Sequence, residues 1–298
     1  MRRVIALGYF DGVHLGHGEL LRLARERAAQ MDAIPSMLSF DCHPSTLLAA
    51  VPEMMLTSVE DRRGLAARFY GVDDCIELHF DRARMCQPWQ AFLQEMQDVY
   101  GAVWFVVGEN FRCGWRGEGT AALLHAWGEA CGCGVDVVPQ LQMDGAPISS
   151  TRIRTLIADG QMEEATRLLG HRHVLTAEVC HGRRIGHEIG VPTLNQLVAP
   201  GLLAPKPGSY FTVAVTPDGV ERPAITSVST RPTVSENDAV TVESHVLDGC
   251  GELYGAQVRV EFCRYDAPIE RFDSIAALKA RIDRSVASAR KYFGLNEK

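Results

Sequence analysis

The sequence predicts an N-terminal α/β domain with a parallel sheet, followed by a small antiparallel β-barrel with a terminal helix. Three observations predict this architecture. Strand-like and helix-like segments alternate through the first half of the chain. Short β-branched segments, separated by Gly and Pro, fill residues 176–262. The 298 residues suffice for two domains of roughly 100–200 residues each, and a change in composition near 169–174 separates a domain at 1–170 from one at 171–298.

In the first half, apolar runs predict strands, and apolar residues at helical spacing predict helices that cover both faces of a Rossmann-like sheet. The predicted strands are 4–7, 36–40, 75–80 and 102–107, and the predicted helices are 19–31, 58–70 and 89–100. In the second half, the clearest strands are 210–215, 240–246 and 258–262, and helical spacing returns at 274–292.

Composition and charge exclude several classes of function. The net charge of −7 leaves no broad basic surface for a polynucleotide, so we expect small-molecule substrates and no nucleic acid. No run of about 18 apolar residues is present, so we expect no membrane partner. Nine scattered cysteines and an N-terminus unlike a secretory signal indicate a cytoplasmic protein with reduced thiols. We expect a monomer or a weak homo-oligomer.

The segment Gly8–His17 follows the first predicted strand and opens the first helix, where open α/β sheets bind phosphates. Its glycines let the backbone approach a ligand closely. His14 and His17 can donate hydrogen bonds to phosphate oxygens and stabilise charge when a phosphoanhydride breaks. Two alternatives remain open: one histidine caps the helix while the other lies on the surface, or the two form part of a zinc site.

A second cluster lies at residues 148–154, where Ser and Thr can cap a helix whose N-terminus attracts anions. Arg152 and Arg154 add fixed positive charge suited to phosphate. A capped helix with solvated arginines is the alternative. Together with the histidines, this cluster is expected to enclose the phosphate chain of one ATP.

These two segments resemble the HxGH nucleotidyltransferase superfamily, and the whole chain resembles the bacterial bifunctional riboflavin kinase/FAD synthetases. The segments Asp41–Pro44 and Gly108–Gly114 match as well. The family usually has an Asp where this chain has Asn110 and an aromatic residue where it has Cys113. These two changes affect local flavin or adenine contacts rather than the phosphate chemistry.

The resemblance implies that the phosphate of FMN attacks the α-phosphorus of ATP, with Mg²⁺ on the phosphates and release of pyrophosphate. His14 and His17 would be the catalytic residues of this step. The remaining ATP- and phosphate-binding residues would be Gly8, Phe10, Asp11, Gly16, Ser150, Thr151 and Arg154, and the flavin-binding residues would be Asn110, Phe111 and Arg112.

The segment 181–195 has three glycines followed by Pro-Thr-x-Asn, and it resembles the ATP loop of a flavokinase. A plain β-hairpin is the alternative. The resemblance makes Glu243 the general base that takes the proton of the ribityl hydroxyl, although a solvent-facing Glu is the ordinary alternative. It makes Thr193 and Asn195 the Mg²⁺ ligands. The implied kinase ATP-binding residues are Gly182, Gly186, Gly190, Pro192, Thr193 and Asn195.

The C-terminal tail departs from this family. Ala267 and Ile269 replace charged residues, and Arg281 and Ser285 replace a Gln and an Asp on the last helix. Three hypotheses follow. We favour an enzyme that converts riboflavin to FMN and FMN to FAD. The alternatives are an FMN adenylyltransferase whose degenerate kinase module binds flavin or is structural, and a flavin- or nucleotide-sensing protein without turnover.

Overall fold

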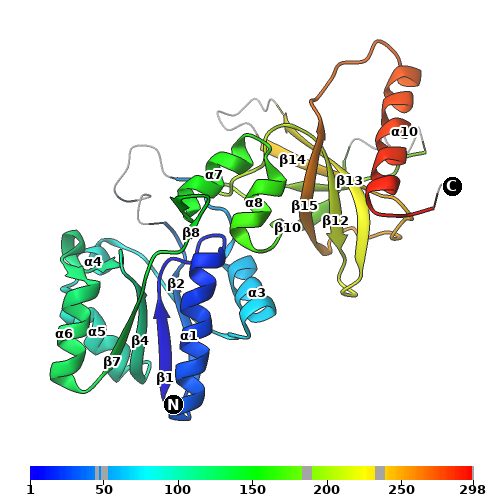
Figure 1. Ribbon diagram of the computed structural model, residues 1–298. Helices are drawn as coiled ribbons and strands as arrows, with labels where there is room; N and C mark the ends of the chain where they lie inside the picture. The colour runs from blue at the N-terminus through cyan, green and yellow to red at the C-terminus, as the bar shows by residue number, and fades with distance from the viewer. Residues whose placement is uncertain (44–46, 48–52, 183–189, 232–238, 297–298) are drawn as a thin grey trace. The chain divides into compact units, whose positions relative to one another are not determined.

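The computed structural model (Figure 1) describes the chain except for residues 44–46, 48–52, 183–189, 232–238 and 297–298. It divides into two compact units, 1–150 and 151–298. Each unit is built around its own sheet. No helix among the described residues is both long enough and apolar enough to cross a membrane.

The first unit is a parallel five-stranded sheet in the order β3-β2-β1-β4-β7. In Figure 1, α1 and α3 cover one face of this sheet, while α5 and α6 cover the other. Its strands are β1 (Arg3–Leu7), β2 (Ile34–Phe40), β3 (Asp74–Leu78), β4 (Ala102–Gly108) and β7 (Gly134–Val138). Its helices are α1 (Leu15–Met31), α3 (Val59–Tyr70), α4 (Arg82–Cys86), α5 (Trp89–Asp98) and α6 (Ala121–Cys131).

The core of this unit explains the apolar runs in the sequence. Val4, Ile5, Ala6 and Leu7 are all at most 1% exposed, because helices cover both sides of β1. β1 ends at Leu7, directly before Gly8, and β4 ends at Gly108, at the same edge of the sheet. This edge is where an open α/β sheet binds its ligand.

Helix ends follow local chemistry. The side chain of Ser58 accepts a hydrogen bond from the backbone N–H of Asp61 and begins α3, and Gly71 ends it with a φ of +65°. The first helix begins at Leu15 rather than at the predicted Glu19, because the imidazole of His14 acts as its N-cap. His17 therefore lies within the first turn of α1.

The second unit contains α7 (Ser150–Ala158), α8 (Met162–Leu169) and a closed six-stranded barrel in the order β10-β11-β14-β13-β12-β15. All described strand pairs of the barrel are antiparallel. Its strands are β10 (His173–Cys180), β11 (Leu194–Leu197), β12 (Gly208–Val215), β13 (Glu221–Arg231), β14 (Ala239–Val246) and β15 (Gln257–Ala267). Helix α10 (Ile275–Tyr292) follows the barrel.

A mixed core fills the barrel. One part is apolar and includes Val179, Ala214 and Val258. Another part is a buried row of hydroxyls, in which Thr226 bonds to both Thr212 and Ser244 at 2.7 Å. These hydroxyls satisfy one another across three strands, so their burial leaves no polar group of the row without a partner.

The predicted fold class is confirmed: a parallel α/β sheet is followed by an antiparallel barrel and a terminal helix. The predicted division at 170 and 171 differs from the compact units, which meet at 150 and 151. The helices α7 and α8 account for the difference, because they belong to the unit that contains the barrel. The boundary chosen from composition marks the start of the barrel strands instead.

Candidate active sites

A cavity of about 290 Å³ opens at the carboxyl ends of β1 and β4. Four separate parts of the chain form it, and glycines line it at Gly8, Gly16 and Gly108. The side chains and backbone that line it belong to residues 7–9, 14, 16, 17, 20, 108–111, 138–141 and 148–150. The cavity therefore brings the two histidines together with Ser149 and Ser150, which lie more than a hundred positions later in the chain.

His14 and His17 form a stacked pair in this cavity. Their ring centroids are 3.6 Å apart with an interplanar angle of 12°, and Phe10 packs 5.1 Å from the ring of His17. The Nδ1 of His14 accepts the backbone N–H of His17 at 3.2 Å. His14 thus caps the helix, as one alternative reading of the sequence had it, and lines the cavity at the same time.

His17 is held as a neutral imidazole. Desolvation, His14 and the guanidinium of Arg62 all lower the pKa of His17 well below its usual value of 6.5. Its Nδ1 is buried and has no hydrogen-bond partner among the described residues. A neutral imidazole has one donor and one acceptor nitrogen, so His17 can offer an N–H to an anion without prior protonation.

The loop before α1 is conformationally strained. Phe10 and Val13 have φ values of +57° and +41°, a region that L-residues rarely occupy, and Gly12 has +80°. The carboxylate of Asp11 holds this loop: it is 2% exposed and accepts the backbone N–H groups of Leu56 and Thr57 at 2.9 and 3.2 Å. The predicted phosphate-binding residue Asp11 therefore supports the loop through its side chain.

Arg62 is a site residue that the sequence reasoning missed. It is 2% exposed and donates to the carbonyl of Tyr9 at 3.1 Å, the hydroxyl of Ser39 at 2.6 Å and the carbonyl of Phe40 at 3.1 Å. Its guanidinium also stacks 4.8 Å above the ring of Tyr9. The one signal available in the sequence was that Arg62 lies, at helical spacing, on the same face of α3 as apolar residues.

The segment after residue 148 joins the histidine loop through one direct bond. The hydroxyl of Ser150 donates to the carbonyl of Asp11 at 2.9 Å, across 139 positions. Ser150 is also the first residue of α7. Thr151, Arg152 and Arg154 follow in the first turns of that helix, in the second compact unit.

A more apolar cavity of about 420 Å³ shares Leu7, Gly8 and Phe111 with the first one. Of the predicted flavin-binding residues, Phe111 lines both cavities, Asn110 lines the first and Arg112 lines the second. The remaining walls include Phe40, Phe80, Phe92, Cys113 and Trp115. The two spaces meet at the end of β1, so a planar apolar ring and a phosphate chain have adjacent places.

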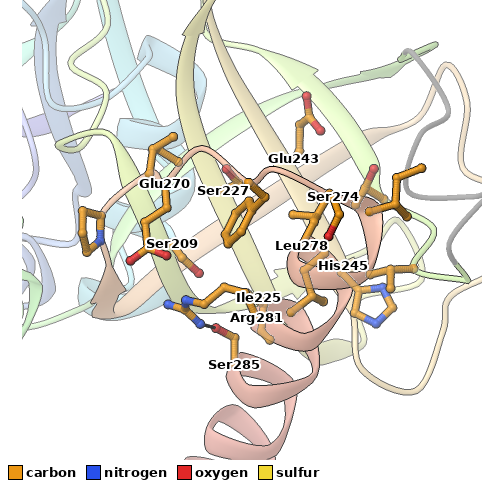
Figure 2. A pocket seen from close by; sticks show the side chains of 17 residues that line it. Ser209, Ile225, Ser227, Glu243, His245, Glu270, Ser274, Leu278, Arg281 and Ser285 are labelled. Atoms are coloured by element: carbon orange, nitrogen blue, oxygen red, sulfur yellow. Dashed lines mark hydrogen bonds between the residues drawn. The ribbon is translucent and has the colours of Figure 1, made fainter.

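A third cavity, of about 560 Å³, lies in the second unit between the barrel and α10 (Figure 2). Glu243 lines it, half-buried on β14, opposite Asn195 of β11 and Ser227 of β13 in the strand register. The cavity is lined by Val191, Thr193, Ser209, Ile225, Ser227, Glu243, His245, Pro268, Ile269, Glu270, Phe272, Ser274, Ile275, Leu278, Arg281, Ile282 and Ser285.

Thr193 and Asn195 form one cluster beside this cavity. The amide nitrogen of Asn195 donates to both the carbonyl and the hydroxyl of Thr193 at 3.1 Å. The carbonyl of the adjacent Pro192 bonds to the ring of His245 at 2.9 Å. Gly182 packs against the Asn195 amide, because a Cβ there would lie 2.3 Å from Oδ1.

Of the other predicted residues of this ATP loop, Gly190 has a φ of +77°. Gly186 lies outside the described residues, as does Pro44 of the matching segment Asp41–Pro44. No group of three or more His, Cys, Asp or Glu side chains among the described residues could hold a metal ion. A metal here would rely on other oxygen donors and on phosphate.

Comparisons with known proteins cover both units. Residues 1–152 match the family model of FAD synthetase, and residues 169–293 match that of riboflavin kinase. The bifunctional riboflavin kinase/FMN adenylyltransferase of Escherichia coli strain K12 is 32% identical over 99% of this chain and 94% of its own length. The enzyme of the same description from Listeria monocytogenes is 30% identical over 98% of this chain and 93% of its own length.

A solved structure has a similar fold along nearly the whole chain. It is described as a macrolide-efflux protein from Streptococcus pneumoniae, with a TM-score of 0.84 and 26% identity. The match covers 97% of this chain and 94% of that one. The similarity therefore extends to both the parallel sheet and the barrel.

Proposed function

This chain belongs to the family of bifunctional riboflavin kinase/FMN adenylyltransferases, and we propose how its own residues carry the two reactions of flavin cofactor biosynthesis. In the barrel unit, ATP phosphorylates riboflavin to FMN. In the α/β unit, ATP adenylylates FMN to FAD and pyrophosphate leaves. The observation that carries the second assignment is the cavity that joins His14, His17 and Ser150.

In adenylylation, an oxygen of the FMN phosphate attacks the α-phosphorus of ATP, and the bond from that phosphorus to the bridging oxygen of pyrophosphate breaks. The nucleophile is already an anion, so the site has to align the reactants and stabilise charge. His17, as a neutral N–H donor, and His14 would contact the phosphate chain. Gly8 and Gly16 leave room for the rings of Phe10 and His14 beside the phosphate chain, and the carboxylate of Asp11 fixes the loop.

Ser150, Thr151 and Arg154 would bind the outer phosphates from the start of α7. Ser150 lines the cavity, and its helix N-terminus favours an anion. The isoalloxazine ring of FMN would occupy the adjoining apolar cavity, with Phe111 against the ring and Asn110 and Arg112 at its polar edges.

In phosphorylation, the carboxylate of Glu243 would take the proton of the ribityl 5′-hydroxyl as that oxygen attacks the γ-phosphorus of ATP. Gly182, Gly186, Gly190 and Pro192 would shape the ATP loop. Glu243 lines the cavity from β14 and is half-buried, which favours this role over that of an ordinary solvent-exposed Glu. The same position favours a working kinase over a purely structural barrel.

Mg²⁺ is the cofactor that these reactions imply, and Thr193 and Asn195 fit it. Their hydroxyl and amide oxygens are hard donors, held together by the bond between their side chains. Two protein ligands with substrate phosphates are a usual set for Mg²⁺. The ion would neutralise charge on the transferring phosphate.

Purified protein with ATP, Mg²⁺ and either riboflavin or FMN tests both assignments, with products separated by chromatography. We expect His17→Ala to abolish FAD formation from FMN while FMN formation from riboflavin continues, since the two sites are separate. We expect Glu243→Gln to show the opposite pattern, with a loss on the order of a hundredfold or more in phosphorylation.

The alternatives give different results in the same assay. FAD from FMN but no FMN from riboflavin would identify an adenylyltransferase with a degenerate kinase module. No product from either substrate would identify a sensing protein. The nine cysteines, all within the described residues, are free thiols, and we place the enzyme in the cytoplasm as a monomer or weak homo-oligomer.

A further inference from the structure

Two of the tail residues that depart from the family pattern, Arg281 and Ser285, line the third cavity and form a cluster with Asp266. Asp266 is on β15, and Arg281 and Ser285 are one turn apart on α10. Arg281 Nη2 lies 3.2 Å from Asp266 Oδ2, Ser285 Oγ donates to the same oxygen at 2.6 Å, and Arg281 Nη1 donates to Ser285 Oγ. The three side chains therefore connect the strand to the helix.

This cluster is largely shielded from solvent. The side chains of Asp266 and Arg281 are 14% and 19% exposed, and Ser285 is buried at 5%. Both the position and the orientation of the guanidinium are fixed, because two of its nitrogens have partners. A charged side chain held in this way loses little further entropy when it binds a ligand.

Arg281 and Ser285 line the cavity, whereas the carboxylate of Asp266 neutralises the guanidinium from behind. A guanidinium has five N–H donors and no acceptor. The hydrogen bonds of Arg281 to Ser285 and Asp266 use two of these donors, so the others remain available for a ligand. Arg281 is also the one Arg or Lys among the described residues that line this cavity, together with two carboxylates at Glu243 and Glu270.

The surroundings select the kind of ligand that Arg281 can meet. Ile225, Phe272, Leu278 and Ile282 supply apolar walls next to it. Figure 2 shows Glu243 and Arg281 well separated across the cavity. A ligand that fills the space thus needs a flat apolar body to contact these walls. It needs hydrogen-bond acceptors at the end near Arg281 and a hydroxyl at the end near Glu243.

We infer that Arg281, positioned by Asp266 and Ser285, is the specificity-determining residue that binds the carbonyl-bearing pyrimidine edge of the flavin ring. The inference rests on the proposed kinase function for the identity of the ligand. The C2 and C4 carbonyls and N1 of an isoalloxazine are acceptors, which match a donor-only fork. Arg281 and Ser285, which replace the family's usual Gln and Asp, then provide a different contact to the flavin, and the site still binds riboflavin.

The test compares Arg281→Met with Arg284→Met, a matched control on an exposed position of the same helix. Steady-state kinetics give kcat and the KM values of riboflavin and ATP separately, and quenching of flavin fluorescence in the presence of Mg-ADP gives riboflavin affinity directly. We expect Arg281→Met to weaken riboflavin binding on the order of ten- to hundredfold. The KM of ATP should change less than twofold, and Arg284→Met should behave as wild type.

A spectroscopic measurement distinguishes contact with the ring from support of the helix. A guanidinium at the pyrimidine edge stabilises the flavin deprotonated at N3, so bound riboflavin should ionise at lower pH in the wild type than in Arg281→Lys or Arg281→Met. Arg281→Lys keeps a charge without the fork, and we expect an intermediate riboflavin affinity. This variant replaces Arg281→Met in every comparison if the latter does not fold.

Unchanged riboflavin affinity in the Arg281 variants would overturn the inference, as would equal effects on riboflavin and ATP accompanied by a lower Tm. A wild-type protein that binds riboflavin without phosphorylating it would instead contradict the kinase function. In that case the fluorescence and ionisation measurements still decide the role of Arg281. The two failures are therefore separate outcomes.

Discussion

Replacing Gly16 with Ala should impair adenylylation while having opposing effects on stability. A Cβ at residue 16 would lie 3.2 Å from both Cε1 and Nδ1 of His14. The ring therefore has to shift by a few tenths of an ångström, away from its stack on His17. If a displacement of about 1 Å costs roughly a hundredfold in rate, this shift should cost roughly three- to tenfold in kcat.

The effects of this substitution on stability oppose each other. Ala in place of a helical Gly contributes roughly 0.5–1 kcal/mol. Weakening the cap between His14 Nδ1 and the His17 N–H costs about 0.5–2 kcal/mol. The free energy of unfolding should therefore lie between about 0.5 kcal/mol above and about 1.5 kcal/mol below that of the wild type.

Gly64→Ala is the matched control for this prediction. Gly64 is an exposed residue of α3, and a Cβ there would meet nothing within 4 Å. It should raise the free energy of unfolding by roughly 0.5–1 kcal/mol and leave FAD formation unchanged. Urea unfolding and the FMN adenylylation assay measure both variants. Wild-type kcat in Gly16→Ala would refute the proposal that the histidine stack aligns the phosphate chain.

Two further predictions concern the barrel unit. Burial lowers the pKa of His173 to about 3, whereas the same imidazole in the unfolded chain has a pKa near 6.5. As the pH falls, the unfolded state therefore binds the proton first. The contribution of His173 to the free energy of unfolding should be complete above about pH 6.5 and should fall by about 1.4 kcal/mol per pH unit below it. Urea unfolding at several pH values should show a shallower slope for His173→Gln, and an equal slope would contradict the prediction. Gly182→Ala should push the Asn195 amide away from Thr193 and raise the Mg²⁺ concentration needed for phosphorylation, with FAD formation from FMN as the internal control.

The sequence predicted the elements whose chemistry is local. The run Val4–Leu7 is apolar at every position because helices cover both faces of β1, and this pattern is unambiguous in the sequence. The predicted helix 58–70 matches α3 to within one residue, and the structure shows Ser58 as its N-cap. The start of α1 was placed four residues too late, because a histidine as N-cap is not an expected signal.

The contacts that the sequence could not predict are made between elements far apart in the chain. Arg62 donates to carbonyls and a hydroxyl that lie 22 to 53 positions away, so its position in α3 could indicate burial but not its partners. In the tail, comparison with the family pattern showed lost charges at 267, 269 and 285 and a gained positive charge at 281. Asp266, which pairs with Arg281 across 15 positions, did not stand out because it lies outside that pattern.

The placement of carboxylates distinguishes the two proposed reactions. An FMN phosphate is an anion and attacks without losing a proton, so adenylylation needs no general base. Glu109 is the one carboxylate among the described residues that line the cavity of the two histidines, and it accepts the backbone N–H of Gln140 at 3.0 Å.

An alcohol must lose its proton to attack phosphorus, and Glu243, the proposed general base, lines the barrel cavity. The first cavity instead has His17, kept neutral by burial and by the charge of Arg62 beneath the loop. Exchanging these groups would impair both reactions. In the first cavity, a carboxylate in place of His17 would repel the phosphates. In the barrel cavity, a neutral imidazole in place of Glu243, without a fixed charge nearby, would stabilise less of the developing charge. Under the proposed roles, the barrel cavity contains the carboxylate that an alcohol nucleophile requires, and the first cavity contains a neutral donor for an anionic nucleophile.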